Sequence, residues 1–294
     1  MGPDPVRGIS VVLPCLNEEA SLGEVIEMAR RGIARLGLAE DIVVVNNGST
    51  DRSAQVAAEH GARVVAEPQR GYGAALRRGF GSARYDLLVM GDADLSYDLS
   101  DLSRLVAPLL DGSADFVMGN RMRNIQPGAM PWLHRYVGNP LLSAILRLLF
   151  RTRAVHDAHC GLRAITRTAY DRLQCVTTGM EFASEMVVRA IRSRLRIAER
   201  PIVYRPRVGQ SKLHSFRDGW RHLRFMVLHS PTLLLLVPGL VGWGLGLALS
   251  LPLAFGPLVI RGRLVDIHCM LAGGVLNLIS LQLLTMGLLA KAYG

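Results

Sequence analysis

The chain has 294 residues, of which 50% are hydrophobic and 20% charged, with a formal net charge of +10 at pH 7. This length holds one large domain or two small ones. The four cysteines lack the spacings of a metal site or a disulfide framework, which is consistent with a reducing compartment. Basic side chains concentrate between Arg192 and Arg224, and such a stretch suits phosphate-bearing partners.

The first 120 residues alternate short apolar segments with helical patterns. We predict strands over 9–13, 41–45, 62–66, 87–90 and 116–118, and helices over 20–36, 71–83 and 100–110. A further helix follows Asn47, with Ser49 or Thr50 as its cap and Asp51 in its first turn. Short apolar strands that alternate with helices predict an α/β fold, with a mostly parallel sheet covered on both faces.

Polar side chains follow four of these predicted strands. They are Asn17 and Glu18, Asn46 and Asn47, Asp92 and Asp94, and Asn120 and Arg121. Ligands of such sheets bind outside the carboxyl ends of the strands, so we expect these side chains to meet at one site.

Asp92 and Asp94 stand one residue apart, directly after the predicted strand 87–90. Their carboxylates are hard oxygen ligands suited to Mg²⁺ or Mn²⁺, ions that keep open positions for substrate phosphates. An Asp-x-Asp by itself is also common in solvated turns, and it is the agreement with the other strand ends that favours a metal site.

The pattern changes after Arg123. Residues 132–150 and 215–229 read as amphipathic helices that lie on a membrane surface. Residues 232–260 contain no charged side chain, and residues 267–290 contain none apart from the titratable His268, so each stretch is long enough to cross a bilayer. Pro238, Pro252 and Pro257 could kink the first span or shorten it into a re-entrant hairpin.

These segments predict a multi-pass protein of the cell membrane. No signal peptide is visible, so we expect the N-terminal domain on the cytoplasmic face, although Arg261 and Arg263 fit an external loop poorly. The expected organisation is a catalytic domain over 1–214, a juxtamembrane helix over 215–230 and a membrane domain over 231–294. With membrane spans adjacent and no nucleic-acid-binding motif present, we expect the basic stretch to face a membrane and not nucleic acid.

Seven motifs follow one another along the chain. They are Val12-Leu13-Pro14-Cys15-Leu16-Asn17-Glu18-Glu19, Asn46-Asn47-Gly48-Ser49-Thr50-Asp51, Gly71-Tyr72-Gly73-Ala74-Ala75, Asp92-Ala93-Asp94-Leu95, Gly119-Asn120-Arg121, Asp157-Ala158-His159-Cys160-Gly161-Leu162-Arg163-Ala164 and Gly209-Gln210-Ser211-Lys212-Leu213. In this order they resemble the inverting family 2 glycosyltransferases of GT-A fold, and among them the polyprenyl-phosphate sugar synthases typified by dolichol-phosphate mannose synthase. The resemblance runs from about Ile9 to Leu213.

The resemblance implies a role for each matched residue. The residues implied to frame the donor nucleotide are Pro14, Asn17, Glu18, Asn46 and Asp92, and those implied to hold donor or acceptor phosphates are Arg121, Arg135, Arg207, Ser211 and Lys212. Asp92 and Asp94 would bind Mg²⁺ or Mn²⁺, and Asp92, Arg121 and Asp157 are the implied catalytic residues. The family usually carries Asp at the position of Asn46 or Asn47, so the resemblance leaves the donor nucleotide, GDP or UDP, undecided. Dolichol-phosphate mannose synthases can carry a metal-binding Gln at the position of Ser96, so it also leaves the full set of metal ligands undecided.

The implied reaction moves a monosaccharide from a nucleotide-sugar to the phosphate of a polyprenyl phosphate. Asp157 would orient the acceptor, act as a base or serve a structural role. Glu181 and Glu185 could serve near the sugar, but the sequence favours surface salt bridges for them. Two alternatives are a family 2 transferase acting on a glycan or lipid hydroxyl, and a non-catalytic membrane scaffold with a degenerate domain. The Gln-x-x-Arg-Trp motif of processive synthases is absent. The sequence leaves the sugar and the oligomeric state open.

Overall fold

The computed structural model describes residues 8–209, 215–230, 232–256, 258–260, 263–265 and 267–293. The chain divides into two compact units, Met1–Leu223 and Arg224–Gly294. Each unit is described by itself below.

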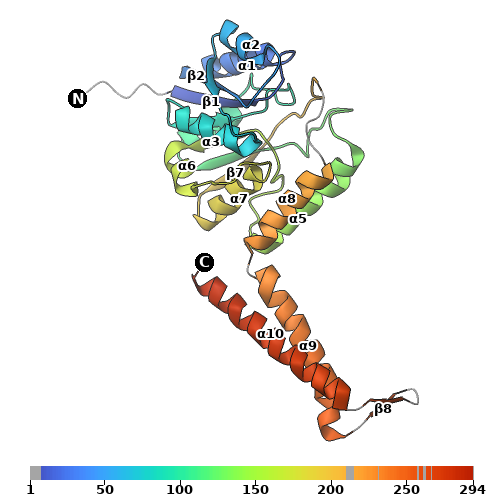
Figure 1. Cartoon of the computed structure of the whole chain (residues 1–294). Coiled ribbons are helices and arrows are strands. Elements are labelled where there is room, and N and C mark those ends of the chain that lie inside the picture. The colour runs from blue at the N-terminus through green and yellow to red at the C-terminus, as the bar shows by residue number, and fades with distance from the viewer. Residues whose placement is uncertain are drawn as a thin grey trace, which may run out of the picture. The chain divides into compact units, whose positions relative to one another are not determined.

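Within the described part of the first unit, seven strands form one sheet in the order β3-β2-β1-β4-β6-β5-β7 (Figure 1). The strands are β1 Gly8–Cys15, β2 Ala39–Asn46, β3 Arg63–Ala66, β4 Leu87–Met90, β5 Phe116–Asn120, β6 Arg163–Thr166 and β7 Ile197–Pro201. Strands β3, β2, β1 and β4 run parallel to one another, and β5 runs parallel to β7. Strand β6 is antiparallel to both β4 and β5, which makes the sheet mixed but mostly parallel, as the sequence predicts.

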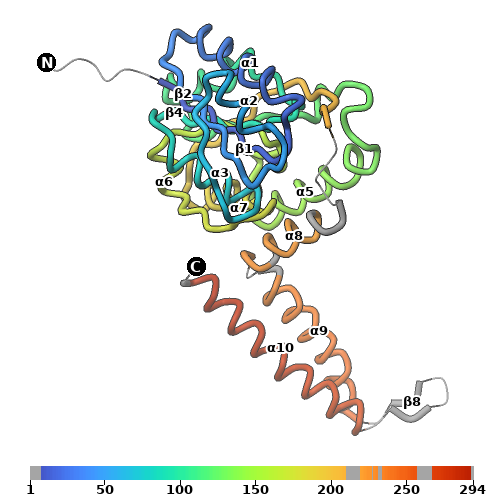
Figure 2. Tube along the Cα trace, turned by 45° about the horizontal axis from the view of Figure 1, so that its top comes forward, coloured from blue at the N-terminus to red at the C-terminus, as the bar shows by residue number. Residues whose placement is uncertain are grey.

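Helices cover both faces of the sheet (Figures 1 and 2). One face carries α1 Leu22–Arg35, α2 Ser53–Glu59 and α4 Ser103–Leu110, and the other carries α3 Tyr72–Ser82, α6 Arg167–Leu173 and α7 Phe182–Arg192. On the first face, Ile9 and Val11 of β1 enter the same fully buried cluster as Leu22 and Val106. On the second face, Gly79 of α3 lies against Val12 and Val45, where a Cβ would collide with both side chains. Neighbouring β1 residues thus serve opposite layers, as strand geometry requires.

The predicted strands and helices before Arg123 are present, with end points shifted by a few residues. The start of α2 differs: neither Ser49 nor Thr50 caps it, because the helix begins at Ser53. The Asp51 carboxylate instead accepts the Ser53 backbone N–H at 3.0 Å and the Ser53 hydroxyl at 2.5 Å. The side chain that the sequence places in the first turn therefore closes the turn before it.

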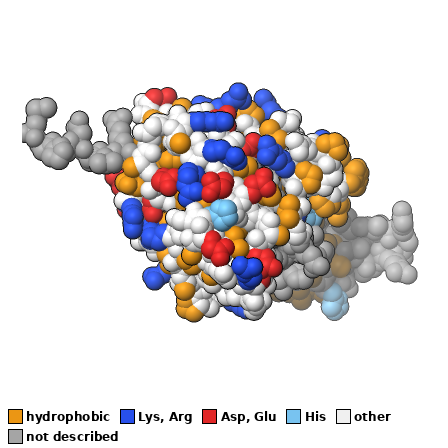
Figure 3. Space-filling view, turned by 90° about the horizontal axis from the view of Figure 1, so that it is seen from above, with side chains coloured by type: hydrophobic (Ala, Val, Ile, Leu, Met, Phe, Trp, Pro, Cys, Tyr) orange, Lys and Arg blue, Asp and Glu red, His pale blue; other side chains and the backbone are white. Residues whose placement is uncertain are grey.

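The face seen in Figure 3 mixes acidic and basic side chains. Ion pairs also occur along the helices: Arg30 pairs with Glu27 within α1, and Arg52, the N-cap of α2, pairs with Glu59 of that helix. Such interleaving gives no broad field of one sign on this face, in contrast to the basic stretch later in the chain.

The predicted amphipathic segments are helical. Residues 132–150 form a π-helical turn, η1 His134–Gly138, continued by α5 Asn139–Phe150, and residues 215–229 contain α8 Ser215–Leu228. Large apolar side chains on the first segment stay in solvent: Trp132 is 68% exposed and Leu148 is 76% exposed. Exposed apolar side chains of this kind favour the predicted contact of this segment with a membrane surface or another protein.

The second unit contains two long apolar helices that lie side by side (Figure 1). Its elements are η2 Thr232–Leu236, α9 Val237–Ser250, a 3₁₀ turn η3 Pro252–Phe255, β8 Leu258–Ile260, β9 Arg263–Val265 and α10 Ile267–Tyr293. Two helical segments in the described residues, Leu234–Phe255 and Ile267–Ala292, are long and apolar enough to cross a membrane. Pro238 is the second residue of α9 and Pro252 is the first residue of η3, so both lie in the first turn of an element, where proline is tolerated.

Small residues let α9 and α10 approach closely. A Cβ on Gly273 would lie 2.8 Å from the Gly246 carbonyl oxygen and 3.0 Å from the Leu249 Cβ. Backbone contact of this kind is typical of helix pairs in lipid.

Candidate active site

A cavity of about 330 Å³ opens where β1 and β4 end, at the edge of the sheet that the sequence predicts for ligand binding. Its lining is Pro14, Cys15, Leu16, Glu18, Asn47, Arg70, Gly71, Tyr72, Ala75, Asp92, Ala93, Asp94, Gly179, Met180, Arg207 and Arg221. We call it the Asp92–Asp94 cavity. Pro14, Glu18, Asp92, Asp94 and Arg207 are sequence-predicted site residues that the fold brings together there.

A larger cavity of about 480 Å³ lies elsewhere on the same unit, between α3 and α6. Arg77, Arg78, Tyr170 and Asp171 are among its lining residues. It contains no pair of neighbouring carboxylates, and Arg77 already donates to the Val176 carbonyl at 3.0 Å. The chemistry therefore favours the smaller cavity.

Asp92 follows β4 and has one defined hydrogen-bond donor. The Tyr72 hydroxyl, at the start of α3, donates to Oδ1 of Asp92 at 3.0 Å. Oδ2 faces Gly161, where a Cβ would lie 2.8 Å away, so any larger residue at Gly161 would press on the carboxyl group. Burial, and then the neighbouring charge of Asp94, raise the pKa of Asp92 to about 7.

Asp94 is almost fully buried and paired with an arginine. Its Oδ1 accepts the Ser96 backbone N–H at 3.0 Å, and its Oδ2 accepts Nε of Arg207 at 3.0 Å and also the Nη2 group. The Asp94 carbonyl accepts the Val208 N–H at 3.0 Å, which ties the segment after β7 to the Asp-x-Asp turn. Arg207 is thus the arginine of the cavity that pairs directly with Asp94.

The donor set of this cavity fits a divalent cation. Asp92 and Asp94 are close enough for the charge of one to raise the pKa of the other, and a cation between them would relieve that repulsion. No group of three or more His, Cys, Asp or Glu side chains that could hold a metal ion occurs among the described residues. Two carboxylates completed by substrate phosphates and water are the usual protein contribution to Mg²⁺.

The other predicted nucleotide residues build the loops around the cavity. Asn17, in the left-handed conformation at φ 52°, accepts the Thr50 N–H at 2.7 Å through its side-chain oxygen. Asn46 turns its side-chain oxygen to the Ser49 N–H at 2.9 Å, and neither asparagine lines the cavity. Asn47 does line it, and its amide joins the Glu67 and Gln69 carbonyls to the Gly71 N–H.

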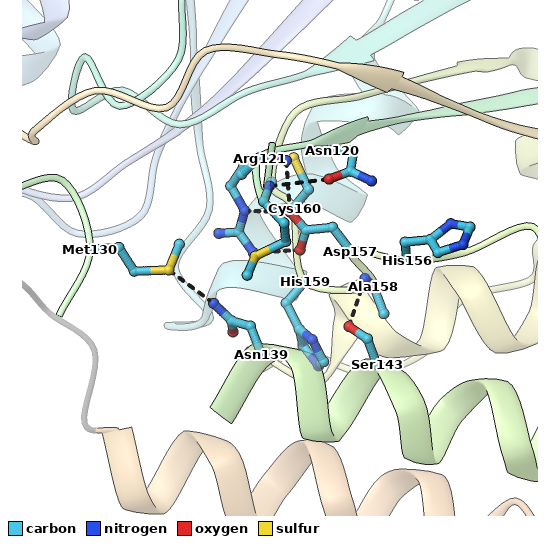
Figure 4. Close-up of polar contacts among 12 residues, drawn as sticks. Asn120, Arg121, Met130, Asn139, Ser143, His156, Asp157, Ala158, His159 and Cys160 are labelled. Atoms are coloured by element: carbon cyan, nitrogen blue, oxygen red, sulfur yellow. Dashed lines mark hydrogen bonds and ion pairs between the residues drawn. The ribbon is translucent and has the colours of Figure 1, made fainter. Parts of the chain in front are cut away.

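Arg121 and Asp157 form a sealed ion pair (Figure 4). The Arg121 Nε and Nη2 groups donate to the two Asp157 oxygens at 2.8 and 2.7 Å, and its backbone N–H adds a third hydrogen bond at 3.0 Å. Their side chains are 8% and 0% exposed, and neither lines the cavity. Burial alone would raise the pKa of Asp157, but the Arg121 guanidinium lowers it.

Glu199 of β7 holds the backbone on both sides of this ion pair in place. Its carboxylate accepts the backbone N–H groups of His156 and Asp157 at 2.6 and 2.9 Å, and the Asn120 side chain at 3.0 Å. Figure 4 shows His156 pointing away from the Arg121–Asp157 pair. Glu199 therefore joins the end of β5 to the segment that carries Asp157.

The remaining predicted residues lie elsewhere. Arg135 is on η1, 5.3 Å from the Tyr136 ring centroid, and does not line the cavity. Ser211 and Lys212 lie outside the described residues. The surface interpretation of Glu185 is wrong: the residue is fully buried, pairs with Arg189 at 2.7 Å and accepts the Thr177 N–H at 2.8 Å, because the preceding loop folds over the start of α7.

The structure adds cavity residues that the sequence did not single out. Tyr72 stands inside the quoted Gly71-Tyr72-Gly73 motif, so a signal for it was present. Arg70 carries no such signal, whereas Arg221 lies inside the basic stretch 192–224, which the sequence assigns to phosphate-bearing partners as a group without singling out this residue. Met180 lines the cavity because the segment before α7 packs against the start of α3, where the Thr178 carbonyl accepts the Ala74 N–H at 3.1 Å.

Known proteins resemble this chain over most of its length. It is 42% identical to the low-salt glycan biosynthesis hexosyltransferase Agl6 of Haloferax volcanii, over 95% of this chain and 67% of that protein. It is 32% identical to the dolichyl-phosphate hexose transferase of the same organism, over 72% of this chain and 89% of the relative.

A solved structure shares the fold. Glucosyl-3-phosphoglycerate synthase from Mycobacterium tuberculosis, in complex with Mn²⁺, UDP-glucose and phosphoglyceric acid, superposes with a TM-score of 0.60 and 26% identity. The match covers 76% of this chain and 79% of that one. The family model for glycosyl transferase family 2 matches residues 10–174, which contain both Asp92 and Asp94. The chain therefore belongs to glycosyltransferase family 2.

Proposed function

We propose that this protein transfers a monosaccharide, with inversion, from a GDP- or UDP-sugar to the phosphate of a polyprenyl phosphate. The observation that carries the proposal is the Asp92–Asp94 cavity, where a carboxylate pair and arginines share one edge of the sheet. The relative named as a dolichyl-phosphate hexose transferase supports the acceptor class. The structure with UDP-glucose and Mn²⁺ supports a nucleotide-sugar donor and a divalent cation.

Asp92 and Asp94 are the residues that would hold Mg²⁺ or Mn²⁺. The cation supplies positive charge for the diphosphate of the donor, which is the leaving group. Arg207 pairs with Asp94 in the structure, and we propose that it binds the donor diphosphate once a cation takes its place at Asp94. Its planar guanidinium can then donate two hydrogen bonds to diphosphate oxygens.

The proposed reaction does not require a general base. An oxygen of the lipid phosphate attacks the anomeric carbon, the bond from that carbon to the diphosphate oxygen breaks, and the electron pair leaves with the nucleoside diphosphate. The attacking phosphate is already anionic at neutral pH, so no side chain has to remove a proton. The protein has to bring two polyanions together and stabilise the charge that develops on the leaving group.

The other implied residues support this site in the proposal. Pro14 and Glu18 border the donor nucleotide from the cavity wall, and Asn17 and Asn46 shape the loops beneath it. Arg121 and Asp157 act indirectly, because Arg121 holds Asp157, whose segment carries Gly161 against Asp92. Arg135, Ser211 and Lys212 remain proposed phosphate ligands.

The two long apolar helices suggest that the reaction takes place at a membrane surface. We propose that α9 and α10 cross the cell membrane, that η1 and α5 lie on its surface, and that the catalytic domain is cytoplasmic. Leu278 and Leu288 of α10 are 71% and 61% exposed, as residues facing lipid would be. A polyprenyl phosphate keeps its tail in the bilayer and its head group at the interface, within reach of such a domain.

Purified full-length protein incubated with undecaprenyl phosphate, Mg²⁺ or Mn²⁺ and a panel of UDP- and GDP-sugars tests the proposal. Mass spectrometry of the lipids should reveal one lipid-linked monosaccharide phosphate, which also identifies the donor. Release of nucleotide without a lipid product would point to a hydroxyl acceptor. No reaction with any donor would favour a scaffold without catalytic activity.

A further inference from the structure

Three arginines reach the Asp92–Asp94 cavity from three separate segments. Arg207 follows β7 and pairs with Asp94, and Arg70 precedes α3 and donates to the Gly48 carbonyl at 3.3 Å. Arg221 belongs to α8, the helix that leads into the apolar helices. Its side chain is exposed, so it stands where a ligand can reach it.

The residue after Arg221 holds this part of α8 in place. His222 is 7% exposed, and its Nδ1 lies 2.8 Å from the Ser184 hydroxyl of α7. Its ring meets that of His159 edge to face, with centroids 4.5 Å apart. Burial, and then His222, hold the pKa of His159 well below its usual range, so the two rings pack without charge repulsion near neutral pH.

The contacts of His222 fix the register of α8 against the domain that holds Asp92. His159 belongs to the same short segment as Gly161, which faces the Asp92 carboxyl group. Trp220, on the other side of Arg221 in the chain, is 59% exposed. The buried His222 lies next to Arg221 in α8, and it is Arg221 whose side chain borders the cavity.

Charge and geometry then specify the ligand class. Two of the carboxylates that line the cavity suit a cation, whereas its guanidinium groups suit an oxyanion. A guanidinium presents a planar fork that matches two phosphate oxygens.

We propose that Arg221 binds a phosphate oxyanion of one of the two substrates, and that His222 is the positioning residue that holds it there. This inference rests on the proposed function and adds α8 to the active site. The oxyanion belongs either to the diphosphate of the donor or to the phosphate of the lipid acceptor, which offer the same chemistry to the guanidinium.

Arg221→Ala and Arg221→Lys in the full-length protein test this inference, with Arg224→Ala as the matched control. Arg224 lies three residues further along α8, is exposed and does not line the cavity, so its removal changes the charge of the helix equally. The measurements are KM for the nucleotide-sugar and for undecaprenyl phosphate, and the affinity for UDP and GDP with Mg²⁺ by calorimetry.

Arg221→Ala should raise one KM about tenfold or more, Arg221→Lys should recover only part of the loss, and Arg224→Ala should stay within about twofold. A higher KM for the donor with weaker nucleotide binding assigns Arg221 to the diphosphate. A higher KM for the lipid with unchanged nucleotide binding assigns it to the lipid phosphate.

The inference is overturned if both KM values and the nucleotide affinities of Arg221→Ala match those of Arg224→Ala while the wild type makes lipid-linked sugar. A wild type that makes none refutes the proposed function instead. In that case the calorimetry still decides, since a loss of UDP or GDP affinity supports a phosphate role for Arg221 and an unchanged affinity refutes it.

Discussion

Two arginine–aspartate ion pairs of this protein differ in their access to solvent. Arg121 and Asp157 are 8% and 0% exposed, with both carboxylate oxygens satisfied by the guanidinium. Arg207 and Asp94 are 31% and 3% exposed and line a cavity. A closed pair cannot exchange partners without leaving a buried charge, whereas an open pair can give up its arginine to an incoming cation and phosphate. The two pairs therefore differ in solvent access and not in residue type, and we propose a structural role for the buried pair and a chemical role for the accessible one.

The pair at the cavity should dominate activity. Asp94→Asn keeps the size of the side chain but removes its charge, so we expect transfer to fall by about a thousandfold, on the order of 4 kcal/mol. The initial rate of lipid-linked sugar formation at saturating Mg²⁺ measures this. Asp98→Asn is the control, because Asp98 pairs with Arg205 in the same loop and does not line the cavity. Near-normal turnover of Asp94→Asn would remove Asp94 from the site.

The sealed pair should dominate stability. Asp157→Ala leaves the Arg121 charge buried without its partner, and we expect a loss of about 3–5 kcal/mol in the free energy of unfolding. The double variant Arg121→Met/Asp157→Leu should recover most of this loss, since an apolar pair of similar volume needs no partner. Denaturant or thermal unfolding of the full-length protein reports both effects. Asp115→Ala, at the exposed pair with Arg196, should change the unfolding midpoint little.

The contributions of Asp92 and Asp157 to the free energy of unfolding should change with pH in opposite directions. The pKa of Asp92 is about 7 in the folded protein against 3.8 ordinarily, so the folded state binds the extra proton between these values. With metal removed by chelator, stability should therefore fall as pH rises from about 4 to 7, by at most about 1.4 kcal/mol per pH unit.

Asp157 has the opposite sign. Its pKa is lowered in the folded state, so its contribution is present above the ordinary value of 3.8 and is lost as pH falls below it. Unfolding measured from pH 4 to 7 should become flatter in Asp92→Asn. An unchanged slope in that variant would show that Asp92 is not the group that titrates.

The smallest effect is expected from Tyr72. Tyr72→Phe removes the hydroxyl that donates to Asp92, which should lower kcat/KM about tenfold, on the order of 1.4 kcal/mol. Loss of this donor also raises the pKa of Asp92 further, so the acidic limb of the pH–rate profile should move to higher pH. A variant with an unchanged profile would mean that the hydroxyl has no influence on Asp92.

The edge of the sheet that holds the site was predictable because parallel strands place their carboxyl ends together. Pro14, Glu18, Asp92 and Asp94 each stand at or just after a strand whose apolar run is continuous in the sequence. Their meeting in one cavity follows from the alternation of strands and helices alone.

The antiparallel strand β6 was not predictable in this way. Its four residues include Arg163, which reads as a surface side chain but is 1% exposed. The guanidinium is buried because it donates to the carbonyls of Ala158, Cys160 and Ala183 at 2.7–2.8 Å, partners that only the fold brings near. Arg221 was missed for a related reason, since its place depends on the contacts of His222 with α7.

Binding of Mn²⁺ to the wild type and to Asp94→Asn, with and without UDP or GDP, tests the central claim most directly. Electron paramagnetic resonance counts the free ion in the full-length protein. We expect the nucleotide to strengthen Mn²⁺ binding to the wild type, because phosphates complete the coordination, and Asp94→Asn to weaken it at least about tenfold. Equal Mn²⁺ affinity in the two proteins, with nucleotide present, would contradict the assignment of this edge of the sheet as the metal and diphosphate site.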